Sequence, residues 1–309
     1  MSIKLGIHTG PQDLTMQELQ RIWTRADEAG FHWASVWDHF YANPLQSRED
    51  PCFEAVSSMM GIAATTQNMR VGCLVFCTLF RNPGLLAKAA VTIDHLSGGR
   101  VELGLGAGWF EEEFREFGYD FPPLGKRMDQ LEEAIQVIRS LLRDPVTTFK
   151  GEYYELDGAV CSPKPMNPAL RIWIGGRGER RTPLLAARYA DGFNVPYLSP
   201  EDYARRVAAL DRACEEVGRD PAEIERSVNV GFYMSADRTA AAEKRAREST
   251  FEAAMAGGSL VGTPAEAVDR IGEYERAGAQ GLNIAFRPPV DWDAFEAFIA
   301  EVLPVFHAD

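Results

Sequence analysis

The chain has 309 residues, of which 46% are hydrophobic and 25% are charged, and its formal net charge is -13 at pH 7. This composition predicts a globular protein with one large core, and its acidic surface argues against nucleic-acid binding. No run of about 18 apolar residues occurs, so no membrane span is expected. The N-terminus lacks the layout of a signal peptide, and the five cysteines are scattered. We therefore expect a cytoplasmic protein with reduced thiols.

Short apolar runs alternate with helical patterns along the chain. We expect strands at residues 3–8, 33–37, 70–76, 101–105, 171–174, 192–195, 227–234 and 281–286. Helices are expected between them, including residues 14–29, 54–66, 85–96, 127–142 and 182–190. Each expected strand is apolar on both faces, as a parallel sheet covered by helices requires. Residues 145–168 break the alternation and indicate an insertion that contains a small hairpin.

Eight strand–helix units in a single domain of residues 1–309 predict a (β/α)8 TIM barrel with insertion segments. In such a barrel the chemistry lies at the C-terminal ends of the strands. A doubly wound open sheet is the alternative. That fold places a glycine fingerprint after its first strand, where this chain has His8-Thr9-Gly10-Pro11 instead.

The segment after the fifth expected strand has the composition of an anion site. It combines three glycines with three arginines: Gly175, Gly176, Arg177, Gly178, Arg180 and Arg181. Glycines that open a helix present bare backbone N–H groups beside the positive helix terminus, and this geometry binds phosphate or carboxylate. The alternative is a glycine-rich turn with solvated arginines. Three arginines in so acidic a chain favour the anion site.

Two histidines lie at expected strand ends, His8 and His39, and Asp38 precedes His39. A catalytic metal would usually require further histidine or carboxylate ligands, so we expect no metal site. His39 is either a functional residue or a turn histidine. Asp38 is either a turn residue or a group that orients His39 or accepts an N–H from a ligand.

Glycines alternate at the end of the fourth expected strand, in the run Gly104-Leu105-Gly106-Ala107-Gly108-Trp109. They either make room for packing inside the barrel or let a flat ring lie against the backbone, with Trp109 and Phe110 as walls. The three glutamates at positions 111–113 are expected to be a solvated helix start, where negative charge is favourable.

Taken together, these motifs resemble the bacterial luciferase-like flavin and deazaflavin oxidoreductases. The motifs that carry the resemblance are Asp38-His39, Phe80-Arg81-Asn82-Pro83, Ser97-Gly98-Gly99-Arg100, the run from Gly104 to Trp109, and the run from Ile174 to Arg181. The resemblance extends from about Ile3 to the last helix. Within the superfamily, the chain looks most similar to the branch that depends on coenzyme F420, an 8-hydroxy-5-deazaflavin.

The resemblance implies a barrel, usually dimeric, that holds a flavin-type ring in its mouth and the cofactor phosphate on the loop after the fifth strand. In the F420 branch, residues matching Asp38 and His39 lie at the ring, and the histidine is often assigned proton transfer or stabilisation of an intermediate. The family carries a non-prolyl cis peptide on the third strand, which by position falls at Cys73–Leu74. The resemblance thus adds ring contacts at Cys73, Leu74, Val75, Gly106, Ala107, Gly108 and Trp109.

The function implied is hydride transfer between C5 of coenzyme F420 and a small organic substrate, with His39 and Asp38 as catalytic residues. An FMN-dependent monooxygenase that uses O2 is the alternative, and a cofactor-binding protein without turnover is a third. The sugar-phosphate dehydrogenase branch has a catalytic glutamate where this chain has Trp109, which argues against that substrate. Glu112 or Glu113 would have to replace that glutamate. A homodimer through the second and third helices is also expected.

Overall fold

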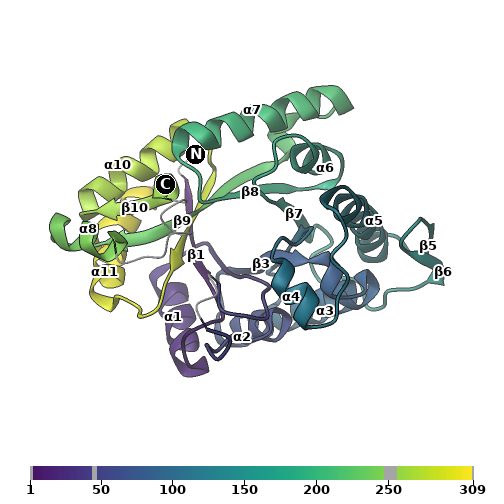
Figure 1. Ribbon diagram of the computed structural model, residues 1–309, viewed down its shortest axis with the longest axis horizontal. Helices are drawn as coiled ribbons and strands as arrows, with labels where there is room; N and C mark the ends of the chain where they lie inside the picture. Colours follow the sequence, from purple (N-terminus) through teal and green to yellow (C-terminus); the bar gives the residue numbers. More distant parts are fainter. Residues whose placement is uncertain (1–2, 44–46, 247–255, 308–309) are drawn as a thin grey trace.

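Parallel strands close into a barrel, and helices cover its outside (Figure 1). This computed structural model describes residues 3–43, 47–246 and 256–307. The barrel strands, in the order in which they pair, are β1 (Lys4–Thr9), β2 (Trp33–Val36), β3 (Arg70–Cys77), β4 (Val101–Gly106), β7 (Arg171–Gly175), β8 (Gly192–Pro196), β9 (Glu225–Met234) and β11 (Gly281–Phe286). β11 pairs in parallel with β1 and closes the ring, which confirms the predicted (β/α)8 barrel.

Helices follow the barrel strands and run back along the outer surface. The longer ones are α1 (Met16–Ala29), α2 (Ala55–Thr65), α3 (Pro83–Ser97), α5 (Leu124–Arg143), α6 (Arg181–Tyr189), α7 (Pro200–Val217), α8 (Arg238–Ala246) and α10 (Pro264–Arg276). Three shorter ones are α4 (Glu111–Glu116), α11 (Trp292–Ala297) and α12 (Leu303–Phe306). Within the described ranges, no helix is both long and apolar enough to cross a membrane.

Two features lie outside the barrel itself. The expected hairpin is present as the antiparallel pair β5 (Thr147–Lys150) and β6 (Glu155–Ala159). A further strand, β10 (Ser259–Gly262), pairs in parallel with the C-terminal half of β9 and was not expected from the sequence.

Local sequence signals determine where α1 begins and ends. Thr15 caps its N-terminus: the Thr15 hydroxyl accepts the Glu18 N–H, and the Glu18 carboxylate accepts the Thr15 N–H. Gly30 ends the helix with φ 90°, a left-handed conformation that glycine adopts without steric cost. The next strand therefore begins within a few residues of the helix end, as the compact barrel requires.

The main core lies between the outer face of the barrel and the helices. Fully buried strand residues on this face include Ile7, Val36, Val71, Leu103, Ile172, Val195, Val230 and Ile284. They pack in one cluster with helix residues such as Leu19, Ile62, Ile138 and Leu210. This continuous apolar layer holds the strand ends, and with them the site residues, in fixed positions.

A buried charged group fills the N-terminal end of the barrel interior. The Glu102 carboxylate accepts a hydrogen bond from the Trp173 indole N–H and forms ion pairs with Arg70 and Arg171. Burial raises the pKa of Glu102, while the two arginines oppose that rise. The ring of Trp173 in turn packs against Trp33, with centroids 4.8 Å apart. The interior is thus filled at this end.

At the opposite end, β3 departs from regular pairing. The Leu74–Val75 peptide is cis, and the register of β3 against β4 shifts between Cys73 and Phe76. The predicted position of the cis bond, Cys73–Leu74, is therefore wrong by one residue. The bulge places an extra residue in the strand, so side chains beyond it change faces relative to a regular strand.

Val75 lies between the ends of β4 and β7, where both neighbours are glycine. A Cβ atom at Gly106 would lie 2.5 Å from a Val75 methyl group, and one at Gly175 would lie 2.4 Å from the other. Gly104 likewise leaves room for the Cys73 carbonyl oxygen, which a Cβ would approach to 2.2 Å. The alternating glycines therefore meet a packing requirement of the bulged strand.

Gly106→Ala is expected to lower the free energy of unfolding by about 1–3 kcal/mol, because the added methyl group would overlap Val75. Val75→Ala removes that obstruction, so the double variant should lose less stability than the sum of the two single variants, by roughly 1 kcal/mol. Urea unfolding of the four chains measures this difference. Additive losses, or an alanine at position 106 without effect, would contradict the packing account.

Candidate active site

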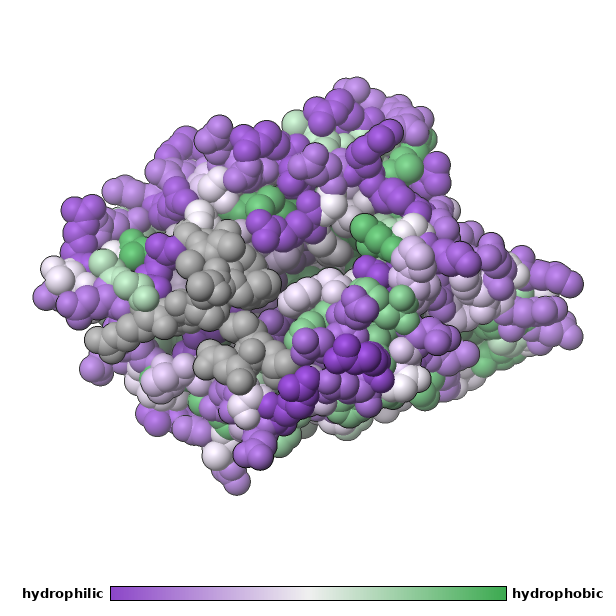
Figure 2. All heavy atoms as spheres, in the orientation of Figure 1, coloured by the Kyte–Doolittle hydropathy of each residue, from purple (hydrophilic) through white to green (hydrophobic). Residues whose placement is uncertain are grey.

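A cavity of about 870 Å³ opens at the C-terminal ends of the barrel strands. Figure 2 shows this face of the molecule hollowed near its centre, with hydrophobic side chains around the hollow. Almost every predicted site residue lines the cavity: Asp38, His39, Leu74, Val75, Gly106, Ala107, Gly108, Trp109, Gly175, Gly176, Arg177, Gly178, Arg180 and Arg181. The structure thus brings together residues from four strand ends, while their roles toward a ligand remain predictions.

Cys73 is the exception. It is fully buried and belongs to the core cluster between barrel and helices, so it does not line the cavity. Its neighbours Leu74 and Val75, on the other side of the bulge, line the cavity instead. The prediction that Cys73 contacts a cofactor is therefore wrong, because the bulged part of the strand begins one residue later.

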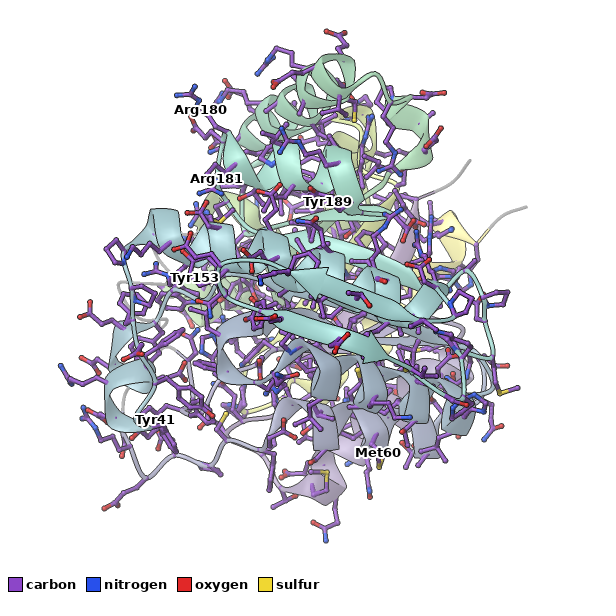
Figure 3. All side chains as sticks on the ribbon, turned by 90° about the vertical axis from the view of Figure 1, so that its right-hand side faces the viewer. Tyr41, Met60, Tyr153, Arg180, Arg181 and Tyr189 are labelled. Carbon is purple, nitrogen blue, oxygen red and sulfur yellow. The ribbon has the colours of Figure 1, made fainter. Side chains whose placement is uncertain are left out.

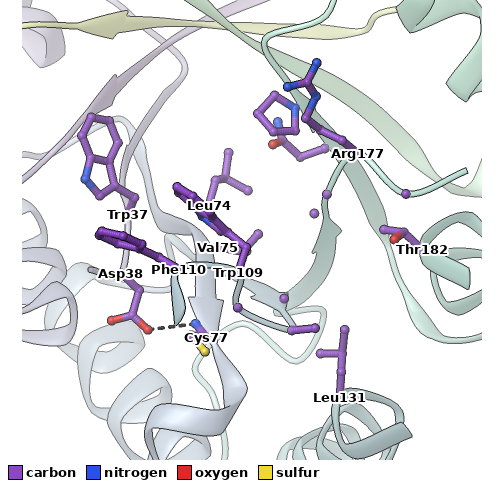
Figure 4. Close-up of a pocket in the computed structure, with 18 of the residues that line it drawn as sticks. Trp37, Asp38, Leu74, Val75, Cys77, Trp109, Phe110, Leu131, Arg177 and Thr182 are labelled. Atoms are coloured by element: carbon purple, nitrogen blue, oxygen red, sulfur yellow. Dashed lines mark hydrogen bonds between the residues drawn. The ribbon is translucent and has the colours of Figure 1, made fainter. Parts of the chain in front are cut away.

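The cavity has two distinct sides (Figure 4). Trp37 and Asp38 lie on one side, Arg177 and Thr182 lie on the other, and Leu74 and Val75 lie between them. A ligand that spans the cavity would therefore meet the glycine–arginine loop at one end and the residues after β2 at the other.

The glycine–arginine loop leads into α6, whose N-terminus lacks a side-chain cap. The first N–H groups of this helix are left without intrahelical partners and are available to a ligand. Arg177 and Arg180 are exposed, and Figure 3 shows Arg180 and Arg181 together at the edge of the molecule. Arg181, however, pairs with Asp129 at 2.6 Å and donates to the Gly125 carbonyl at 2.9 Å. Arg181 therefore ties the loop to α5, and Arg177 and Arg180 carry the charge better placed for an anion.

Two residues of this region were missed by sequence reasoning. Thr182 lines the cavity, and its hydroxyl oxygen lies where a Cβ on Gly178 would approach to 2.5 Å. Arg206, on α7, donates to the Arg177 carbonyl at 3.0 Å and pairs with Glu179 at 2.8 Å. Burial and the charge of Arg206 lower the pKa of Arg177. Thr182 could have been predicted as a site residue, because it lies in the first turn of the helix that follows the glycine–arginine loop. Nothing in the sequence indicates that Arg206 contacts this loop.

Asp38 connects the ends of β2 and β3. Its carboxylate accepts the Cys77 backbone N–H at 2.8 Å and forms a two-point pair with Arg81, at 2.6 and 2.9 Å. Arg81 comes from the Phe80-Arg81-Asn82-Pro83 motif, so two motifs separate in sequence form one ion pair. Asp38 is therefore more than a turn residue, because its side chain orders the loop that follows β3 at the cavity wall.

His39 is held from both sides of its ring. Its Nδ1 atom lies 2.7 Å from a carboxylate oxygen of Glu113, and its Nε2 atom lies 3.1 Å from the Asn43 amide nitrogen. Since an ionised carboxylate only accepts hydrogen bonds, Nδ1 carries the proton and Nε2 accepts from Asn43. This arrangement fixes the tautomer and orientation of the ring, as a carboxylate does for other functional histidines.

Glu113 is buried, which corrects the expectation of a solvated helix start for all three glutamates. Its second oxygen accepts the backbone N–H groups of Phe40 and Tyr41, at 2.8 and 3.0 Å. Phe114, the next residue of α4, packs against Phe80 and turns this face of the helix inward. The carboxylate therefore joins α4 to the chain that follows β2.

Two aromatic side chains flank His39. Trp109 stacks on Phe110, with centroids 5.3 Å apart and planes inclined by 21°, and both rings meet His39 edge-on. Both residues line the cavity, as expected, and Trp109 is 52% exposed. They make the wall beside His39 apolar on the side that opens to solvent.

His8 plays a different part from His39. It is buried, its Nδ1 atom lies 2.8 Å from the Ser35 hydroxyl, and its ring packs on Trp37. Burial, with a contribution from Arg287, lowers the pKa of His8 to about 3, so the ring is neutral near pH 7.

In the part of the chain that the structure describes, no three His, Cys, Asp or Glu side chains are grouped as metal ligands.

The depressed pKa of His8 predicts a stability that falls in acid. Below about pH 6.5 the unfolded chain binds a proton at this histidine and the folded chain does not, so acid favours unfolding. Between about pH 7 and pH 5 the wild type should lose about 2 kcal/mol more stability than His8→Gln. Urea unfolding at both pH values measures this. His32, whose pKa is lowered to about 4, contributes equally to both chains and cancels. Equal losses in the two chains would rule out a neutral buried His8.

Glu113→Gln should disturb both the fold and His39, because its NH2 group would face an N–H donor. We expect a loss of about 1–3 kcal/mol in the free energy of unfolding, measured in urea. Nitrogen-15 NMR of the histidine rings should show His39 protonated at Nδ1 in the wild type and lose that preference in the variant.

The matched control is Glu112→Gln, one residue earlier on α4, where the side chain pairs only loosely with Arg48 at 3.6 Å. It should change stability by no more than about 0.5 kcal/mol and leave the His39 signal unchanged. If both substitutions act alike, Glu113 has no special role in placing the ring.

The fold and the cavity define a (β/α)8 barrel with a ligand-sized cavity at its C-terminal end, and comparison with known proteins gives the family. The chain belongs to the luciferase-like monooxygenase family, whose profile matches residues 1–256. A relative, the F420-dependent glucose-6-phosphate dehydrogenase of Amycolatopsis mediterranei (strain U-32), is 28% identical over 248 residues, which is 78% of this chain and 72% of the relative.

The pyrimidine monooxygenase RutA of Escherichia coli (strain SMS-3-5 / SECEC) is 31% identical over 198 residues, which is 62% of this chain. The match spans about half of that relative's length, 52%. An F420-dependent secondary alcohol dehydrogenase in complex with an F420-acetone adduct shares the fold, with a TM-score of 0.84 at 20% identity and 99% of each chain covered. These relatives are enzymes, and the chain is an enzyme of the same family.

Proposed function

We propose that the chain is a coenzyme F420-dependent oxidoreductase that acts on a small organic substrate. The observation that carries the proposal is one cavity with an anion-binding loop at one end and an oriented histidine at the other. The F420-dependent dehydrogenase from Amycolatopsis supports it, because that match covers most of both chains. When bound, coenzyme F420 would supply hydride transfer at its C5 carbon.

The residues present fit such a cofactor. Arg177, Arg180 and the uncapped N-terminus of α6 would hold its phosphate. Leu74 and Val75, from the bulge of β3, offer an apolar surface between the two sides of the cavity for a flat ring. A cavity of about 870 Å³ is at the large end of the range for ligand sites, with room for a cofactor and a small substrate.

His39 is the residue we propose for proton transfer. Glu113 holds Nδ1 protonated and stabilises the positive charge that appears when Nε2 takes up a proton. Rotation of the Asn43 amide would then present its oxygen to Nε2, so the same contact serves both protonation states. Trp109 and Phe110 keep this side of the cavity apolar and limit access of water to the proton.

An FMN-dependent monooxygenase is the second candidate, and the similarity to pyrimidine monooxygenase RutA favours it. The anion-binding loop would serve the phosphate of FMN equally well. The two candidates differ in their chemistry, because reduced FMN reacts with O2 and a deazaflavin does not. Cofactor binding therefore separates them before any substrate is known.

Titration of the purified protein with coenzyme F420 and with FMN tests the proposal. We expect the dissociation constant for F420 to be at least roughly tenfold lower than that for FMN. Arg177→Gln should weaken F420 binding roughly tenfold or more through loss of a charged contact to phosphate. Arg188→Gln is the matched control, because Arg188 lies on α6, the helix that follows this loop, but pairs with Glu132 on α5.

A preference for FMN, followed by O2 uptake with reduced FMN, would contradict the F420 proposal and support an FMN-dependent monooxygenase. Failure to bind either cofactor would refute the anion-binding loop, as would equal effects of the two arginine substitutions.

We further propose that the chain forms a homodimer through α2 and α3. Large hydrophobic side chains are exposed on both helices, namely Met60, Leu85 and Leu96. Figure 3 shows Met60 at the edge of the molecule, directed away from the barrel. Burial of such side chains against a second copy would remove apolar surface from water.

A further inference from the structure

Two asparagines on neighbouring strands line the cavity from inside the barrel. Asn194 belongs to β8 and Asn229 to β9, and we call them the asparagine pair. The residues before and after each of them pack in the core outside the barrel, namely Phe193, Val195, Val228 and Val230. Because successive side chains of a strand point to opposite faces, the asparagine pair points into the barrel. Only 2% of Asn194 and 1% of Asn229 is exposed.

A hydrogen-bond network fixes the orientation of both side-chain amides. The Asn194 amide nitrogen donates to the Ser227 hydroxyl at 2.9 Å and to the Asn229 side-chain oxygen at 3.1 Å, which uses both of its hydrogens. The Asn283 amide nitrogen donates to the same Asn229 oxygen at 3.0 Å, so that oxygen accepts two hydrogen bonds. A flipped Asn229 would set its NH2 group against two other NH2 groups, and the observed orientation is therefore the stable one.

The network leaves one acceptor and one donor group of the asparagine pair unused. Among the residues that the structure describes, neither the Asn194 Oδ1 atom nor the Asn229 Nδ2 atom has a hydrogen-bond partner. Buried polar atoms in proteins are nearly always hydrogen-bonded, so these two atoms point to a ligand. The backbone holds them in place, because the Asn194 carbonyl accepts the Gly176 N–H at 3.1 Å and the Asn229 carbonyl accepts the Tyr197 N–H at 2.8 Å.

The asparagine pair lies across the barrel from the surface that suits a cofactor ring. In the closed ring of strands, β8 and β9 lie half-way round from β2 and β3. Leu74 and Val75, at the bulge of β3, line the cavity with an apolar surface (Figure 4). A flat ring that packs on this surface turns its other face toward β8 and β9. A reactant bound over that face therefore meets the asparagine pair.

We propose that the asparagine pair binds a neutral amide group of the substrate: Asn229 donates to the amide oxygen, and Asn194 accepts from the amide nitrogen. The proposal rests on the proposed function, in which this cavity is the site of hydride transfer. An amide carries its acceptor and its donor on two atoms, as the pair carries its own on two side chains. Neither asparagine is charged, so an ionised group would lose its hydration here without gaining a counter-charge from the pair. The amide is the recognised group, and the reacting carbon is a different atom.

The test measures binding of three primary amides to the F420-loaded protein: benzamide, phenylacetamide and 3-phenylpropanamide. Each is compared with the methyl ketone of the same skeleton, which lacks the donor, and with the amidine, which lacks the acceptor. Isothermal titration should show at least one amide binding roughly tenfold or more tightly than both counterparts, because each counterpart leaves one buried atom of the pair without a partner.

Asn229→Asp is the most informative variant. One aspartate oxygen can still accept from Asn194 and Asn283, while the other replaces the NH2 group that faces the ligand. The preference should therefore reverse, with the amidine binding roughly tenfold or more tightly than the amide. Asn229→Ala removes the same donor without adding charge and should weaken amide binding roughly tenfold. Asn283→Ala is the matched control: Asn283 belongs to the network but does not line the cavity, so the preference for the amide should remain.

Equal binding of every amide and its ketone to the wild type would overturn the proposal, and so would a loss in Asn283→Ala as large as in Asn229→Ala. An alcohol of the same skeleton that binds as tightly as the amide would overturn the amide class and assign the pair to a hydroxyl group. Circular dichroism and F420 binding are measured first in each chain. Absence of F420 binding in the wild type overturns the proposed function, whereas F420 binding without any amide preference overturns only the role of the asparagine pair. A folded Asn229→Ala chain that binds F420 roughly tenfold more weakly would place the pair at the cofactor and overturn its role toward the substrate.

Discussion

The carboxylate of Glu113 is the contact on which the candidate site depends most. It accepts hydrogen bonds from the His39 ring and from two backbone N–H groups, those of Phe40 and Tyr41. A buried carboxylate without such partners would cost several kcal/mol, so α4 and the chain after β2 are ordered together. Because α4 directly follows Trp109 and Phe110, the same contact also determines where the aromatic wall stands relative to His39.

A second constraint lies in the barrel itself, in the packing of the bulged strand β3 against its neighbours. The bulge in β3 directs Val75 between two strand ends, and the glycines at positions 106 and 175 are what allow it to lie there. Packing and a flat ring were alternative explanations for the glycine run in β4. The structure shows that they are compatible, since the side chain that requires the glycines is the one that lines the cavity.

Much of the fold was predictable because each barrel strand is a short apolar run followed by a helix. This pattern can be recognised in the sequence without knowledge of the tertiary contacts. β10 was missed because Ser259–Gly262 contains only two apolar side chains, Leu260 and Val261, which is too short a run to distinguish a strand from a loop. The cis bond was placed one residue early, since a bulge changes which side chains face inward and a sequence does not reveal where that change occurs.

The site was predictable where motifs follow strands, as with Asp38, His39 and the glycine–arginine loop. It was not predictable where partners come from distant helices. Glu111, Glu112 and Glu113 look alike in sequence, and only the rotation of α4 buries the third. Arg206 lies 29 residues beyond the Arg177 carbonyl that it contacts, in a helix with many exposed charges.

Charge distribution links these observations to the proposed chemistry. The chain as a whole is strongly acidic, with a net charge of -13, yet Arg177 and Arg180 line the cavity beside the uncapped N-terminus of α6. Positive groups at the mouth of a barrel within an acidic surface concentrate the local field on the cavity and favour anionic ligands there over the rest of the surface.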